Sequence, residues 1–188
     1  MPDEPRDRLL AAVVRCAGRV GLGRITVEEV AREAGVGRAS VYRWFPGGRD
    51  QLVDEGVTWE VGRFLARIGD AVDDAPDFAT RLERGLVFAH RAIEDHEVLQ
   101  HLLRTEPSGV LPQLRAVAPL VIAVIRDELQ PLLQEEPLRP GVDPAEAAEV
   151  IARLFLSFTV NQGSWDLTDP DQVHELVRGH LLVGVLAC

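Results

Sequence analysis

The 188-residue chain carries a formal net charge of −10, and 46% of its residues are hydrophobic but only 5% aromatic. This apolar content supports a folded core and excludes wholesale disorder, and the dominance of Leu, Val and Ala favours helices over an aromatic-rich β-sandwich. The two cysteines, Cys16 and Cys188, form no CxxC pair, so we expect no disulfide scaffold and a cytoplasmic location.

Charge is distributed unevenly along the chain, and every basic residue is Arg. Residues 1–50 hold nine Arg and seven acids, whereas residues 51–188 hold 11 Arg and 23 acids. The net charge alone argues against a nucleic-acid partner. The asymmetry predicts instead that the first part tolerates a polyanion and the second repels it.

The first 50 residues contain three predicted helices. Residues 6–20 repeat apolar residues on one helical face and end at Gly21 and Gly23. Thr26 precedes the second helix, with Glu29 three residues later as in a capping box. A break at residues 35–37 separates it from a short helix over residues 38–45, which Pro46 stops.

The rest of the chain is predicted to be helical as well. A long helix runs from about residue 50 to 72, and further helices cover 78–94, 96–104 and 110–134, with a turn at 106–109. Asp143-Pro144 and Asp169-Pro170 are helix starts, and the two last helices extend to about 162 and 186. We count about nine helices and no convincing strand, an all-α fold.

No segment is expected to enter a membrane. No charged-then-apolar leader opens the sequence, and no apolar run reaches about 18 residues. The longest, Ala116 to Ile125, is short and contains Pro119.

Residues 26–45 have the spacing of a helix-turn-helix. Two short helices can cross steeply when the first has a small residue at the contact point, the turn has a Gly and the second has a branched apolar anchor. Ala31, Gly35 and Val41 occupy these places. The second helix then presents hydrogen-bonding and stacking side chains outward, which suits DNA.

The stretch TVEEVAREAGVGRASVYRWFPGGRDQL, residues 26–52, resembles the N-terminal signature of the tetracycline-repressor (TetR) family of one-component regulators. Matching features include Thr26, Ala34-Gly35-Val36, Tyr42 and Phe45-Pro46, and the close resemblance covers about residues 8–55. Gly37 stands where the family usually has Ser or Thr, which puts one phosphate contact in doubt, and Trp44 stands where Tyr or His is common.

The resemblance implies a DNA-binding domain over residues 1–48 and an effector-binding, dimerising domain over residues 49–188. Thr26 and Tyr42 would bind phosphates, and Arg38, Ser40 and Arg43 would line the major groove. Arg49 would replace a Lys that most members carry. The predicted DNA-binding residues are Thr26, Arg38, Ala39, Ser40, Tyr42, Arg43, Trp44 and Arg49.

The resemblance also implies a cavity among the middle helices for a small, mainly apolar effector. The alternative for most candidate residues is plain core packing, and for Asn161 and Gln162 a helix terminus. The candidates are Trp59, Phe64, Phe88, His90, Leu103, Val121, Phe155, Phe158, Asn161, Gln162 and Trp165.

The last two helices are apolar nearly all round, which predicts that they are buried in a homodimer. A two-fold dimer would match a palindromic operator on double-stranded DNA. A buried C-terminal hairpin in a monomer is the alternative.

Two other functions compete with that of a repressor released by its effector. An enzyme is not expected, because the sequence has no GxSxG, HExxH or phosphate loop, and no cofactor or metal site is predicted. A protein-interaction module with a vestigial helix-turn-helix would carry acids on residues 38–45, where Arg38, Ser40 and Arg43 stand instead.

Overall fold

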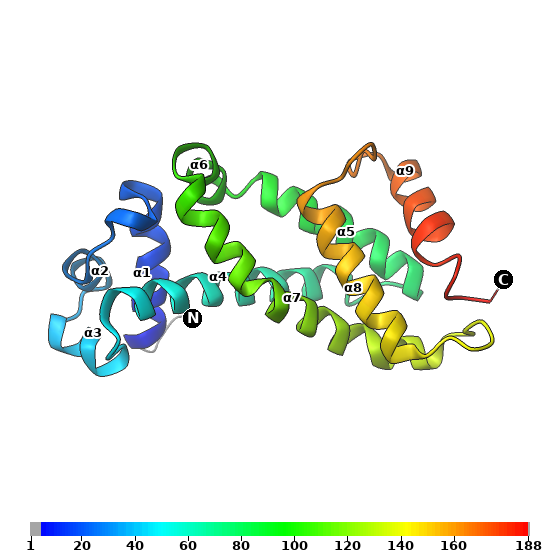
Figure 1. Ribbon diagram of the computed structural model, residues 1–188, viewed down its shortest axis with the longest axis horizontal. Helices are drawn as coiled ribbons and strands as arrows, with labels where there is room; N and C mark the ends of the chain where they lie inside the picture. The colour runs from blue at the N-terminus through cyan, green and yellow to red at the C-terminus, as the bar shows by residue number, and fades with distance from the viewer. Residues whose placement is uncertain (1–4, 188) are drawn as a thin grey trace. The chain divides into compact units, whose positions relative to one another are not determined.

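The computed structural model describes residues 5–187, and this part of the chain contains nine α-helices and no named β-strand (Figure 1). The all-α prediction is therefore confirmed. The helices are α1 (Pro5–Val20), α2 (Val27–Ala34), α3 (Arg38–Trp44), α4 (Gly48–Val72), α5 (Phe78–Glu94), α6 (Glu97–Thr105), α7 (Pro107–Glu135), α8 (Pro144–Val160) and α9 (Pro170–His174).

The helices form two compact units. The first comprises the described residues up to Phe64 together with Glu94–Val117, and the second comprises Leu65–Ile93 and the residues from Ala118 onward. Both α4 and α7 therefore contribute to both units. The predicted boundary after residue 48 concerns function rather than these packing units, and it stays a prediction.

The first unit is built around α1, which packs against α2 and α6. Its core is mainly aliphatic and includes Leu9, Leu10, Val30, Leu52 and Leu102, all less than 5% exposed. Because α1 is amphipathic, its apolar face is buried here while most of its arginines stay at the surface, as the sequence predicted.

The second unit contains α5, the C-terminal part of α7, α8 and the C-terminal segment. Asp143 caps α8 and Asp169 caps α9 by accepting backbone N–H bonds, and each is followed by Pro at the first helical position, as predicted. Inward-facing residues of α8, such as Ile151 and Phe155, are buried.

The predicted turn at residues 106–109 is wrong. Only Glu106 separates α6 from α7, which begins at Pro107. Pro fits the first helical position because its missing N–H has no helical partner there, so Pro107 starts a helix where a turn was expected.

The last helix ends earlier than predicted. After α9 the chain continues as a π-helix over Glu175–Leu181 (η2), in place of α-helix to about residue 186. The segment beyond it turns back, and the N–H of Ala187 donates to the carbonyl of Pro137 at 2.7 Å. An isolated antiparallel bridge between Leu138 and Leu186 lies beside this contact.

The expectation that no segment is long and apolar enough to cross a membrane needs correction. Since Pro112, Pro119 and Pro131 do not interrupt α7, the helix offers an 18-residue window with a mean hydropathy of 1.7. By length and composition alone, this helix passes as a candidate span. Only 17% of the window is buried within the chain, so α7 leaves much of its apolar surface accessible.

Candidate DNA-binding interface

The two helices of the predicted DNA-binding motif are joined as the sequence indicated. Ala31 is buried on α2, and Val41 is fully buried on α3. Gly35 between them has φ +67°, a left-handed conformation that Gly adopts without strain, and its N–H donates to the carbonyls of Ala31 and Arg32. The sharp reversal between α2 and α3 therefore follows from these three residue types.

The outer face of α3 consists of the side chains predicted to meet DNA. Tyr42 is 40% exposed and Trp44 38%, and Ala39 and Arg43 are also exposed. Ser40 is half-buried. Because Val41 and Phe45 carry the inner face, α3 presents one polar and aromatic surface of single-helix width.

Arg38 is the most constrained side chain of this face. Its Nη1 lies 2.6 Å from the carboxylate of Glu28, and its Nη2 donates to the Tyr42 hydroxyl at 3.3 Å. The guanidinium carbon lies 5.5 Å from the centre of the Tyr42 ring. The Tyr42 hydrogen bond and the Glu28 charge raise the pKa of Arg38 above its ordinary value. Sequence reasoning did not single out Glu28.

Thr26 is exposed and begins α2 with the predicted capping box. The Glu29 N–H donates to the Thr26 hydroxyl oxygen at 3.2 Å, and the Thr26 N–H donates to the Glu29 carboxylate at 3.0 Å. The hydroxyl itself donates to Glu29 at 2.8 Å. These hydrogen bonds lower the pKa of Glu29. Thr26 is thus held at the N-terminus of α2, where backbone N–H groups favour an anion.

The side chain of Arg49, in the first turn of α4, is directed toward the backbone that precedes α2. Its Nη2 donates to the carbonyl of Leu22 at 2.6 Å and its Nε donates to that of Ile25 at 3.0 Å. Its Nη1 is paired with Asp50 at 2.7 Å. The DNA contact expected of Arg49 stays a prediction, and in this structure its side chain holds the segment before α2.

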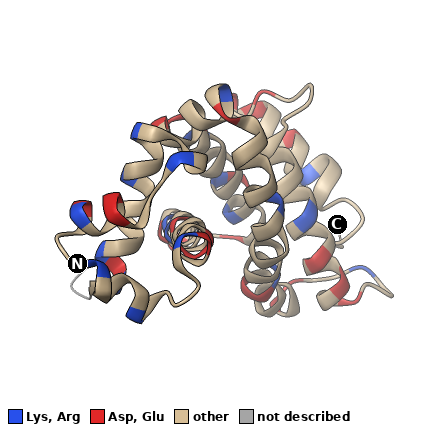
Figure 2. Ribbon diagram, turned by 60° about the vertical axis from the view of Figure 1, so that its left-hand side comes forward, with Lys and Arg blue, Asp and Glu red and all other residues tan. Residues whose placement is uncertain are grey.

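Positive charge on α1 is partly neutralised from α2. Arg15 and Arg19 both bind Glu33, each at 2.7 Å. Figure 2 shows the same mixture in the first unit, where blue Arg positions have red acids beside them. The Arg residues of α3 therefore stand among charges of both signs, and they do not belong to a strong basic patch.

The predicted effector residues are divided between the two units. Trp59 and Leu103 are half-buried and pack against the core of the first unit, and the Arg63 guanidinium lies 4.8 Å from the Trp59 ring centre. Phe64, also half-buried, is the last residue of that unit's first segment. For Trp59 and Leu103 the structure thus records the core packing that was the alternative.

The remaining candidates belong to the second unit. His90, Val121 and Phe155 are buried, and Phe88 and Phe158 are half-buried. Phe155 packs on α5 at Gly85, where an added Cβ would lie 3.2 Å from its ring.

The three polar and aromatic candidates that follow α8 shape the chain's exit from that helix. The Asn161 carboxamide oxygen accepts the Gly163 N–H at 3.2 Å, and the Gln162 oxygen accepts that of Leu167 at 3.4 Å. Trp165 meets the His180 ring edge-on, with 5.2 Å between ring centres. These contacts give each residue a local structural role.

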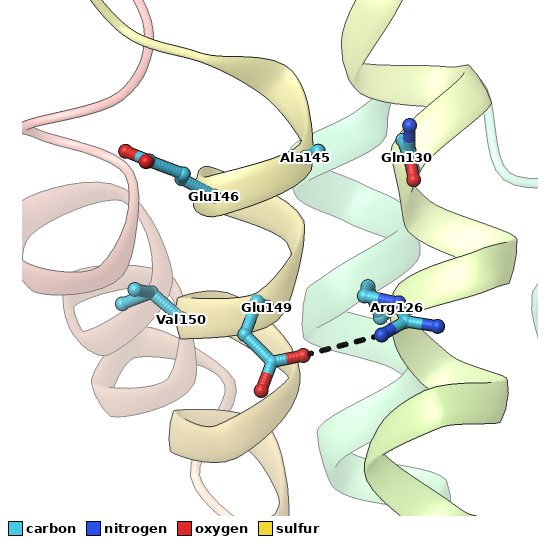
Figure 3. A pocket seen from close by; sticks show the side chains of 6 residues that line it. All are labelled: Arg126, Gln130, Ala145, Glu146, Glu149 and Val150. Carbon is cyan, nitrogen blue, oxygen red and sulfur yellow. Dashed lines mark ion pairs between the residues drawn. The ribbon is translucent and has the colours of Figure 1, made fainter.

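A pocket of about 650 Å³ lies between α7 and α8 (Figure 3). Glu149 points toward Arg126 across it, at 3.8 Å, and Arg126 also pairs with Asp127. The lining residues are Arg126, Gln130, Ala145, Glu146, Glu149 and Val150. None of the predicted effector residues lines it, and three of its six lining residues are charged.

Comparison with known proteins identifies the N-terminal motif independently of this geometry. A model of bacterial regulatory proteins of the tetR family matches residues 9–55, the segment from α1 to the start of α4. An uncharacterised HTH-type transcriptional regulator of Mycobacterium tuberculosis (strain H37Rv) is 28% identical over 172 residues, covering 92% of this chain and 76% of that protein.

A relative and a solved structure extend the match beyond the motif. The nucleoid occlusion factor SlmA of Shewanella sp. (strain MR-4) is 30% identical over 141 residues, 72% of this chain and 68% of that protein. The fold is similar to that of the TetR family repressor AlkX from Dietzia sp., with a TM-score of 0.64, 22% identity and coverage of 96% and 95% of the two chains. The chain belongs to the tetR family of bacterial regulatory proteins, which are DNA-binding transcriptional regulators.

Proposed function

We propose that the protein is a repressor that reads the half-sites of a palindromic operator with α3 and leaves the DNA when a small molecule binds. The observation that carries this proposal is the outer face of α3, where Arg38, Tyr42, Arg43 and Trp44 are exposed while Val41 and Phe45 anchor the helix from within. An exposed helix of this width, bearing Arg, fits the major groove.

The DNA contacts are assigned to residues 1–48, together with Arg49. Arg38, Ser40 and Arg43 face the bases, Thr26 and Tyr42 bind phosphates, and Ala39 and Trp44 make apolar or stacking contacts. The Arg38–Glu28 pair is more than half exposed on both sides, so its rearrangement toward DNA costs little.

A homodimer through the last two helices would place two α3 helices on one duplex. Support comes from exposed aliphatic side chains on this part of the chain: Val150 is 54% exposed, Val160 70% and Val183 52%. Such side chains lose water-exposed area on pairing, and a two-fold axis brings equal patches together.

Residues 49–188 are proposed to hold the effector. The half-buried aliphatic residues of α7 and the aromatic residues of α5 and α8 favour an apolar molecule. Such a molecule lowers DNA affinity only if it binds more tightly to the conformation that does not fit the operator. A protein with this function acts in the cytoplasm, where the DNA is.

Selection of bound sequences from random duplex DNA tests the proposal. We expect an inverted repeat with half-sites about one helical turn apart. Arg43→Ala should then weaken binding to the selected site by about tenfold, since a bidentate Arg–guanine contact contributes about 1–3 kcal/mol. Candidate ligands can be screened for release of the same DNA.

Arg91→Ala provides the matched control, because it also removes an exposed Arg but lies on α5 in the second unit. It should leave binding to the selected site nearly unchanged. A purified dimer that shows no preference for any sequence over competitor DNA at moderate salt would overturn the proposal.

A further inference from the structure

Glu106 is the single residue at which α6 ends and α7 begins. Its N–H donates to the carbonyl of Leu102 at 2.8 Å and so closes α6. Its own carbonyl accepts the N–H groups of Gly109 at 3.0 Å and Val110 at 3.2 Å, which opens α7. Because no linker separates the two helices, any change in the angle between α6 and α7 must change the backbone torsion angles at Glu106.

The side chain of Glu106 reaches across to the segment between α1 and α2. Its Oε1 accepts the N–H of Gly23 at 2.8 Å. A Cβ on Gly21 or on Gly23 would lie 2.5 Å from one of the two carboxylate oxygens, and a Cβ on Gly109 would lie 3.1 Å from the carboxylate carbon. Three glycines therefore make the space that one carboxylate fills.

Arg49 binds the same segment through different backbone groups. It donates to the carbonyls of Leu22 and Ile25, so residues 21–25 are held by an acid from the α6–α7 junction and by a base from the start of α4. Ile25 is followed directly by Thr26, the N-cap of α2. We refer to residues 21–25 as the α1–α2 segment.

We infer that Glu106 is a positioning residue for DNA binding, which it serves by fixing the α1–α2 segment and with it the start of α2. The inference rests on the proposed function, in which Thr26 and α3 contact the operator. If the segment is already ordered in the free protein, binding to DNA does not lose the conformational entropy that ordering it would cost. Glu106 touches no DNA in this scheme and acts through its hydrogen bond with the Gly23 N–H.

The sign of the Glu106→Ala effect on DNA affinity distinguishes positioning from simple charge. Loss of an acid near DNA strengthens binding by electrostatics alone, whereas loss of positioning weakens it. We expect Glu106→Ala to bind the selected operator about fivefold to tenfold more weakly than wild type. The slope of log affinity against log salt should stay unchanged, because no phosphate contact is lost.

Two further variants control for charge and geometry. Glu106→Gln keeps an oxygen that can accept the Gly23 N–H and should fall between wild type and Glu106→Ala. Glu97→Gln removes the same charge from an exposed position at the start of α6 and should bind at least as tightly as wild type. Thermal melting by circular dichroism verifies that all variants are folded.

Gly23→Ala perturbs the contact from the opposite side. Gly23 does not have a positive φ, so Ala is tolerated by the backbone, but its Cβ must displace the carboxylate. We expect Gly23→Ala to weaken operator binding as Glu106→Ala does, and the double variant to be no worse than either single one. Hydrogen exchange of the Gly23 amide in the free protein should accelerate in Glu106→Ala.

The outcomes separate this inference from the proposed function. If wild type selects a sequence but Glu106→Ala binds it as tightly as wild type or more tightly, only the positioning role is overturned. Additive losses in Gly23→Ala and Glu106→Ala would overturn it too. A wild-type protein that selects no sequence would overturn both.

Discussion

The Arg38 guanidinium lies 2.6 Å from the Glu28 carboxylate, which ties the first residue of α3 to the first turn of α2. The two side chains are 62% and 56% exposed, so this ion pair adds little to stability. Its consequence for DNA binding is larger. Breaking the exposed pair costs little, but an acid beside a residue assigned to the groove also repels the DNA phosphates.

We therefore expect Glu28→Gln to strengthen operator binding by about threefold to tenfold at low salt, and less as salt rises, because screening weakens the repulsion. Fluorescence anisotropy with the selected duplex at two salt concentrations measures this. Glu33→Gln is the control, since it removes the same charge from α2 but its partners are Arg15 and Arg19 on α1. Weaker binding by Glu28→Gln would contradict the assignment of Arg38 to the groove.

Two glycines of α4 should respond to Ala in opposite directions. A Cβ on Gly56 would lie 2.7 Å from Cγ1 of Val13, where α1 crosses α4, whereas a Cβ on Gly62 meets nothing within 4 Å. Overpacking costs about 1–3 kcal/mol and outweighs the gain of up to about 1 kcal/mol in helix propensity. In urea unfolding, Gly56→Ala should destabilise the protein and Gly62→Ala should stabilise it by about 0.5–1 kcal/mol. Stabilisation by Gly56→Ala as well would show that α1 and α4 do not approach closely there.

The structural features that were predicted well are determined by residues that are close together in the sequence. The capping box of Thr26 and Glu29 and the Asp-Pro start of α8 are settled within one helical turn, so their residue types suffice. Pro107 shows the limit of such signals. A Pro after a polar residue suits a turn and a first helical position equally, and the choice depends on the packing of α7.

The candidate site was predictable to the same extent. Helical periodicity gave the exposed face of α3, because Val41 and Phe45 are apolar and four residues apart. The partners of the site residues were not predictable. Arg49 binds the carbonyls of Leu22 and Ile25, and Glu106 reaches Gly23 across 83 residues of chain, contacts that leave no local pattern.

Acid should destabilise the first unit through Glu33. Hydrogen bonds from Arg15 and then Arg19 lower the pKa of Glu33 in the folded protein below its ordinary value of 4.5. A lowered pKa means that the stabilisation is present above about pH 4.5 and is lost as pH falls through the folded-state pKa. Glu33→Gln carries no ionisable group there, so its melting temperature should fall less between pH 6 and pH 3.5 than that of wild type.

Comparison with a second variant separates Glu33 from the other acids of the chain. Glu128→Gln removes an exposed acid of α7 and leaves the Arg15–Glu33–Arg19 cluster intact. Its melting temperature should follow the pH dependence of wild type. Parallel curves for wild type and Glu33→Gln would show that the two arginines do not hold Glu33 in solution.

The dimer surface can be tested with matched exposed positions. Val150 is 54% exposed and Leu154, one turn later on the same face of α8, is 37% exposed, while Leu111 on α7 is 53% exposed but lies in the first unit. Burial of an unpaired carboxylate is costly, so Val150→Asp and Leu154→Asp should weaken dimerisation by at least about 100-fold, whereas Leu111→Asp should not. Sedimentation equilibrium gives the association constants.

Operator affinity should fall when the dimer dissociates, because each monomer then binds its half-site without the gain from being linked to a second monomer. Persistent dimers in both α8 variants would move the interface away from α8.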